Sequence, residues 1–166
     1  MQSRTSILSA FTLSSGMAFW AAAIAADLPK SGTIKTHIGI KENSVAVPVG
    51  EKHVLFANTT GAVIYNDAGN GPLHGDAWNC AYSVDFDNGA AKLQGYCASG
   101  DASGLDRIFV TFSGTGNGTG GAGTGVITGG TGQYSGIQGK LAYQCRPADA
   151  AQGIYNCTQL IDYQLQ

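Results

Sequence analysis

The chain has 166 residues, with 9 basic and 11 acidic side chains and a formal net charge of −2 at neutral pH. Charged residues make up only 12% of the sequence and form no basic stripe, which argues against nucleic acid or an anionic membrane surface as a partner. After the N-terminal leader described next, the length fits a single domain.

The first 26 residues are predicted to be a secretory signal peptide. Arg4 precedes an apolar stretch that ends in small residues, and Ala23-Ile24-Ala25 fits the small-x-small cleavage rule; a cut after Ala26 is also possible. Serine, threonine and glycine interrupt the apolar run, which disfavours an uncleaved anchor helix, and no later segment is long and apolar enough to span a bilayer. We therefore expect residues 27–166 to be one exported domain, secreted or periplasmic, with no membrane span in its mature form.

Short strands follow the leader. Residues 33–42 alternate isoleucines with polar residues, and this pattern is typical of a half-buried strand with His37 on its solvated face. Residues 53–58 are also rich in β-forming residues.

Residues 78–97 predict a hairpin whose register brings two cysteines opposite each other. Asn88-Gly89 is a strong signal for a two-residue type I′ turn. A hairpin centred there pairs Val84 with Leu93 and brings Cys80 opposite Cys97, at a non-hydrogen-bonded pair, where the Cα atoms lie within disulfide range. Export implies an oxidising compartment and the chain has 4 cysteines, so the other two are expected to pair as Cys145–Cys157 across a second hairpin.

One face of the first hairpin strand is aromatic. Trp78, Tyr82 and Phe86 share it with Cys80 and Val84. Core packing would explain these residues. If the face lines an open lumen, they become the ligand-binding wall, to which Tyr143 and Tyr163 in the last two strands could add hydroxyl groups.

Residues 106–113 predict another strand, with Asp106 on the same face as Ile108 and Val110. A carboxylate on a barrel interior could act as an acid or base after desolvation, so Asp106 is the candidate catalytic residue; a salt bridge or a solvated strand end is the alternative. The glycine-rich run 113–125 fits either a floppy hairpin tip or a narrow strand pair, and the tip is the favoured interpretation.

The stretch VITGGTGQYSGIQGKLAY, residues 126–143, is rich in glycine but lacks the spacing of a phosphate-binding loop. Turn and bulge glycines explain it better. "TGGTGQYSGIQGKLAYQC" resembles the GGTGxYxGIxG signature of the allene oxide cyclase-like and dirigent-like barrels, and residues 105–116 are similar to bacterial members of that group.

The resemblance implies an eight-stranded antiparallel barrel with a largely apolar lumen, which plant relatives use, without a cofactor, to hold a reactive lipid epoxide or phenolic species. The positions here within the motif, Gln133, Tyr134 and Ser135, do not supply a known acid or base of those enzymes. The two disulfides also depart from the plant pattern.

We therefore expect an all-β fold: a single antiparallel barrel of about eight strands, calycin-like in outline, with a flattened sandwich as the alternative. No metal is expected, because His37, His53 and His74 have no metal-ligand spacing, and the resemblance implies that no cofactor is needed. Three functions remain open: an exported barrel that binds a small apolar or phenolic ligand, a cofactor-free isomerase or cyclase using the same lumen, and a domain with a filled interior that acts through its surface. The oligomeric state is not predicted.

Overall fold

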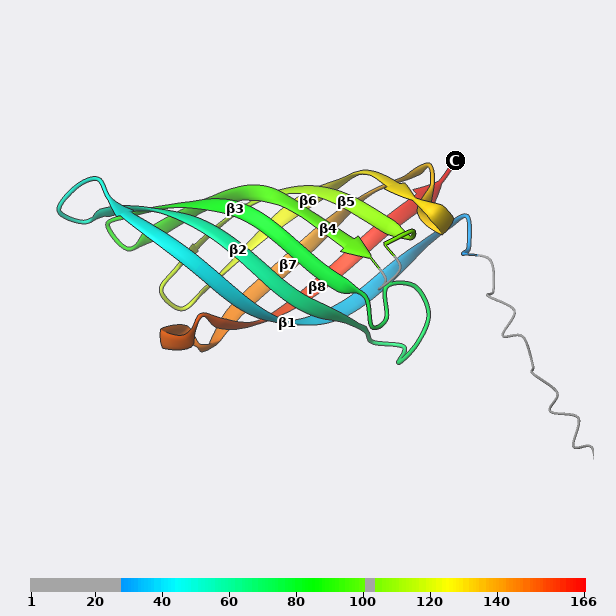
Figure 1. Ribbon diagram of the computed structural model, residues 1–166, viewed down its shortest axis with the longest axis horizontal. Helices are drawn as coiled ribbons and strands as arrows, with labels where there is room; N and C mark the ends of the chain where they lie inside the picture. The colour runs from blue at the N-terminus through cyan, green and yellow to red at the C-terminus, as the bar shows by residue number, and fades with distance from the viewer. Residues whose placement is uncertain (1–27, 101–103) are drawn as a thin grey trace, which may run out of the picture.

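The computed structural model describes residues 28–100 and 104–166, and within them the chain forms one closed barrel of eight antiparallel strands (Figure 1). Each strand pairs with the next along the chain, and the last strand closes the barrel against the first. The strands are β1 (Ser31–Pro48), β2 (His53–Asn66), β3 (Ala77–Asp87), β4 (Ala90–Gly100), β5 (Arg107–Asn117), β6 (Gly120–Thr131), β7 (Ile137–Asp149) and β8 (Ile154–Leu165). The predicted all-β barrel is confirmed. The predicted signal peptide lies outside the described residues.

The β3–β4 hairpin has the predicted register. Val84 lies opposite Leu93 and Cys80 opposite Cys97. Asn88 and Gly89 both have positive φ, 49° and 86°, as a type I′ turn requires. The predicted disulfides are both present, Cys80–Cys97 and Cys145–Cys157, each with Cα atoms 4.1 Å apart.

The prediction of a floppy tip over residues 113–125 is wrong. Strand β5 continues to Asn117 and β6 resumes at Gly120, so that only two residues form the turn. The run is instead a narrow strand pair, because its glycines leave room for a bulky side chain from β7 that lies across them.

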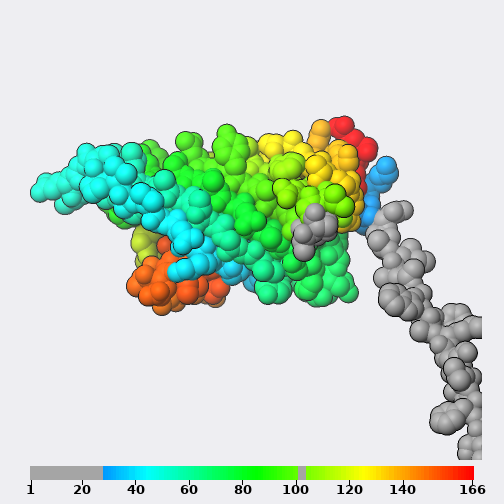
Figure 2. Space-filling view, in the orientation of Figure 1, coloured from blue at the N-terminus to red at the C-terminus, as the bar shows by residue number. Residues whose placement is uncertain are grey.

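The two ends of the barrel differ. The β1–β2, β3–β4, β5–β6 and β7–β8 turns lie at one end, which we call the rim; the β1–β2 hairpin projects furthest from it, as the cyan tip in Figure 2 shows. The β2–β3, β4–β5 and β6–β7 connections lie at the other end, which we call the base. A short 3-10 helix, η2 (Ala150–Gln152), lies in the β7–β8 connection at the rim.

The base is filled by side chains. Its buried residues come from five strands and two connections: Ile34, Ile64, Leu73, Ile108, Tyr134, Ile137 and Tyr163. A second 3-10 helix, η1 (Gly132–Tyr134), sets the Tyr134 ring here, 1% exposed, and the Leu73 amide donates a hydrogen bond of 3.2 Å to its hydroxyl. The glycine-rich motif therefore builds the closure of the barrel, as its interpretation as turn glycines predicts. None of the helices in the described residues is long and apolar enough to cross a bilayer.

Candidate functional site

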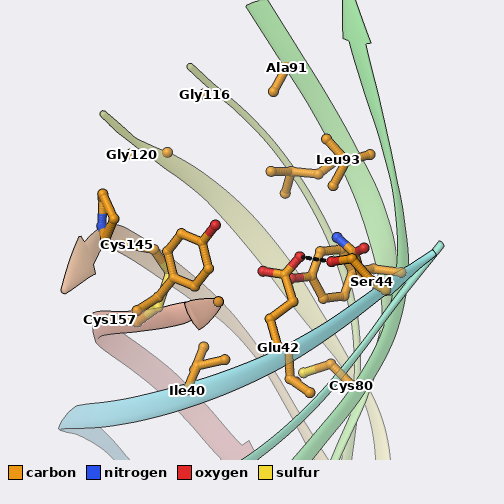
Figure 3. Close-up of a pocket in the computed structure, with 18 of the residues that line it drawn as sticks. Ile40, Glu42, Ser44, Cys80, Ala91, Leu93, Gly116, Gly120, Cys145 and Cys157 are labelled. Atoms are coloured by element: carbon orange, nitrogen blue, oxygen red, sulfur yellow. Dashed lines mark hydrogen bonds between the residues drawn. A yellow bond between two sulfur atoms is a disulfide. The ribbon is translucent and has the colours of Figure 1, made fainter. Parts of the chain in front are cut away.

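A cavity of about 750 Å³ occupies the rim half of the barrel. Its lining runs from buried residues such as Trp78 and Val110 up to the turn residues Gly118 and Gln152, so the cavity opens at the rim. The cysteines of both disulfides are part of this lining (Figure 3). A volume of this size is within the range of small-molecule sites.

An aromatic row forms one side of the cavity. The rings of Tyr82, Phe112 and Tyr143 come from β3, β5 and β7, and neighbouring rings meet edge to face at centroid distances of 5.7 and 5.8 Å. Glycines occupy the strands between them. A Cβ atom at Gly95 on β4 would lie 2.3 Å from the Cβ of Tyr82, and one at Gly123 on β6 would lie 2.4 Å from the Tyr143 hydroxyl. Alternating aromatic and glycine positions thus build a continuous apolar wall.

The Tyr143 hydroxyl lies deep in that wall. It is close to Gly114 as well as Gly123, and among the residues that the structure describes it has no hydrogen-bond partner. Burial raises the pKa of Tyr143 to about 12, because the phenolate would be poorly solvated there.

A polar cluster lies on the adjoining part of the wall, where β1, β2 and β3 are neighbours. Figure 3 shows Glu42 of β1 with its carboxylate in the cavity and Ser44 beside it. The Ser44 hydroxyl donates a hydrogen bond of 2.9 Å to Glu42 Oε1. The Tyr82 hydroxyl lies beside Glu42, and burial followed by the Glu42 charge raises the pKa of Tyr82 far above its usual range. On the other side of β1, burial and the same carboxylate raise the pKa of Tyr155.

Asn58 completes the cluster. It pairs with Ser44 on one side and with Tyr82 on the other, and it is only 5% exposed. Its side chain lies beside the Tyr82 hydroxyl, and within the described residues its buried Oδ1 atom has no hydrogen-bond partner. An orphaned acceptor in a cavity wall is costly unless something else fills its position.

The backbone fixes Glu42 in this position. Its amide donates a hydrogen bond of 2.8 Å to the Gly153 carbonyl, where the ladder between β1 and β8 ends. Beyond this point β1 continues paired with β2 alone. Glu42 therefore lies where the wall begins to open, half-buried rather than fully enclosed.

Four of the five aromatic residues predicted as ligand-binding line the cavity. Trp78, Tyr82, Phe86 and Tyr143 all face it. Tyr163 does not: it packs in the base, 7% exposed, with its ring edge over Gly32. It lies below the cavity because β8 runs from rim to base, and residue 163 is near its base end.

Asp106, the predicted catalytic residue, is not part of the cavity lining. It precedes β5 at the base, where Oδ1 accepts a hydrogen bond of 2.9 Å from the Gln133 amide and Oδ2 accepts one of 2.9 Å from the Gln133 side chain. A Cβ at Gly132 would collide with this carboxylate. Asp106 thus anchors η1 and the closure of the base. Residues 108 and 110 are buried in the barrel, but residue 106 does not continue this alternation, because the strand begins only at Arg107.

Sequence reasoning missed Glu42, although the signal was present. Glu42 has the same parity as Ile34, Ile38 and Ile40, so the alternation of the first strand already placed an acidic residue on the apolar face. Asn58, at the end of the predicted second strand, carried no comparable signal.

Across the described parts of the chain, no three His, Cys, Asp or Glu side chains are grouped so that they could hold a metal ion. The four cysteines are joined in disulfides.

No family model matches the sequence, and no curated protein is similar enough in sequence to count as a relative. Among solved structures, the fold is similar to that of a pterocarpan synthase dirigent protein, with a TM-score of 0.49 and 9% sequence identity over 92% of this chain and 100% of the other. A likeness at this level concerns the fold alone and says nothing of the ligand.

Proposed function

We propose that this protein is an exported barrel that binds a small, largely apolar or phenolic molecule in its lumen. The observation that supports this most directly is the cavity of about 750 Å³, open at the rim and walled by aromatic and aliphatic side chains. The alternative function, a domain that acts through its surface, requires a filled interior. A barrel with a cavity of this volume is not filled.

The two disulfides support the proposed location. Disulfides form and persist in oxidising compartments, so a chain that closes two hairpins in this way is suited to work outside the cytosol. Cleavage after Ala25 or Ala26 would release the domain. Mass measurement of the protein recovered from its host would test this, and an intact leader on the mature protein would contradict it.

Titration with N-phenyl-1-naphthylamine, a neutral apolar probe, tests ligand binding. The full chain carrying Trp20→Phe leaves Trp78, in the cavity wall, as the one tryptophan. We expect probe emission to rise with one-to-one stoichiometry while Trp78 emission falls by energy transfer. Saturation of the probe signal with Trp78 emission unchanged would mean that the probe binds elsewhere and would count against the proposal.

A second candidate function, a cofactor-free isomerase, is favoured by one observation: a carboxylate and a phenol, Glu42 and Tyr82, meet inside an apolar cavity. Glu42 could take a proton from one atom of a bound substrate and return it to another, so that no further reactant is needed. Tyr82 could donate a hydrogen bond to an oxygen that becomes negative.

The probe 5-nitrobenzisoxazole tests whether Glu42 can act as a base. Glu42 would remove the ring C–H proton, the N–O bond would break with its electrons staying on oxygen, and a coloured cyanonitrophenolate would form. We expect a rate above buffer that Glu42→Gln abolishes and Glu51→Gln retains, since Glu51 is exposed in the β1–β2 turn. An unchanged rate in Glu42→Gln would exclude this role for Glu42.

A further inference from the structure

The polar cluster in the cavity contains a carboxylate and, within the described residues, an amide oxygen without a hydrogen-bond partner. The Ser44 hydroxyl donates a hydrogen bond to Glu42, and the Tyr82 hydroxyl lies beside the same carboxylate. The Asn58 side chain lies beside the Tyr82 hydroxyl, and within the described residues its Oδ1 atom has no hydrogen-bond partner. The cluster therefore presents a ligand with the rest of the Glu42 carboxylate and one buried amide oxygen, both of which only accept hydrogen bonds.

The charge of the cavity disfavours an anionic ligand. Among the described residues that line it, Glu42 alone carries a charge, and none is lysine, arginine or histidine. Lys41, the neighbouring basic residue, is exposed on the outer face and bonds to the Gln152 carbonyl. A negatively charged ligand would meet this carboxylate with no cation to offset it.

Aromatic rings frame the same position. The Tyr82 ring continues into the Phe112 and Tyr143 row, and Tyr155 lies close enough to Glu42 for the carboxylate to influence it. Ring faces attract cations, and the attraction grows when the cation is removed from water.

We propose that the natural ligand carries a hydrogen-bond-donating cationic head, an ammonium group, on an apolar body. The ammonium would sit between the Glu42 carboxylate and Asn58 Oδ1, and the apolar body would lie along the aromatic row. This inference rests on the proposed function, because it names the class of molecule that the lumen takes.

Four compounds that share a phenyl group and a four-carbon chain test the head group: 4-phenylbutylamine, 4-phenylbutanol, butylbenzene and 4-phenylbutyrate. Their affinities would be measured at neutral pH by displacement of N-phenyl-1-naphthylamine and by calorimetry. We expect the amine to bind about tenfold or more tightly than the alcohol, as a charge-assisted hydrogen bond implies, and the carboxylate to bind most weakly.

Glu42→Gln assigns the preference to one residue, with Glu51→Gln as the control of equal net charge. We expect Glu42→Gln to weaken amine binding about tenfold and to leave butylbenzene binding unchanged, while Glu51→Gln changes neither. Asn58→Leu removes the orphaned acceptor and should weaken the amine while leaving butylbenzene no weaker.

The outcomes separate the two proposals. If the carboxylate binds as tightly as the amine, the head-group inference is overturned while lumen binding stands, and this result needs no variant. If Glu42→Gln leaves amine binding intact, the role of Glu42 is overturned. If the probe and all four compounds fail to bind, the proposed function fails together with the inference.

Discussion

At the scale of single residues, glycines decide how the aromatic wall is built. Gly123 lies where a Cβ atom would be 2.1 Å from the Ser113 carbonyl oxygen and 2.4 Å from the Tyr143 hydroxyl. Such distances are far below van der Waals contact, so the position has to be glycine for the wall to close as it does.

Gly123→Ala should therefore destabilise the protein by about 1–3 kcal/mol, the usual cost of overpacking a fitted interior. Gly39→Ala is the matched control, because a Cβ there meets nothing within 4 Å on the same kind of strand. Urea unfolding would compare the two. Equal stability of both variants with the parent protein would show that the wall tolerates a side chain at residue 123.

Tyr134 makes stability depend on pH in the alkaline range. Burial, reinforced by Asp76 and Asp106, raises the pKa of Tyr134 to about 12, whereas an unfolded tyrosine titrates near 10. The folded state therefore holds this proton more tightly. Its contribution to stability is complete below pH ~10 and is lost as the pH rises through the folded pKa.

We expect the free energy of unfolding to fall above pH ~10 by up to about 1.4 kcal/mol per pH unit from this residue. Tyr134→Phe removes the ionisable group and should make the fall shallower, even though it loses the hydrogen bond from Leu73. Urea titrations on both sides of pH ~10 measure the slope, and identical slopes in parent and variant would contradict the assignment.

At the scale of elements, the hairpin disulfides tie neighbouring strands next to the cavity. They close loops with sequence separations of 17 and 12 residues. In the chain-entropy model, replacing Cys145 and Cys157 by alanine should cost about 3 kcal/mol. Urea unfolding measures the loss, and parent protein treated with reductant should be at least as destabilised. Peptide mapping that joined Cys80 to Cys145 or Cys157 would contradict the pairing.

Local patterns in the sequence predicted most of the elements. The Asn88-Gly89 turn and the alternation around it determine the register of β3 and β4, because a slip of one residue would turn the aromatic face outward. The strand pair over residues 113–125 could not be predicted in the same way. Glycine carries no face preference, and the Tyr143 side chain that orders the run comes from a strand eighteen or more residues later.

The site was predictable only in part, for the same reason. Trp78, Tyr82 and Phe86 follow from strand parity alone. The exclusion of Tyr163 and Asp106 depends on how far along the barrel axis each residue lies, and only the closed structure determines that. The meeting of Glu42, Asn58 and Tyr82 needs the register of three strands at once.

At the scale of the whole molecule, one end of the barrel is a packed core and the other end is a cavity. The base is closed by η1 and the β2–β3 connection, which meet through Leu73 and Tyr134. The rim remains open, since its turns are short and the β5–β6 turn begins with the small residue Gly118. The packed base and the cavity thus lie in opposite halves of the barrel.

Probe affinity in two neighbouring variants tests the central claim, that the lumen is the binding site. Ala91 faces the cavity and is 8% exposed, whereas Ala90 is exposed beside the turn. Both substitutions, Ala91→Trp and Ala90→Trp, add the same side chain to the same strand end. The account predicts that Ala91→Trp weakens N-phenyl-1-naphthylamine binding about tenfold or more, while Ala90→Trp leaves it unchanged. Equal affinity in the two variants, with both folded by circular dichroism, would contradict it.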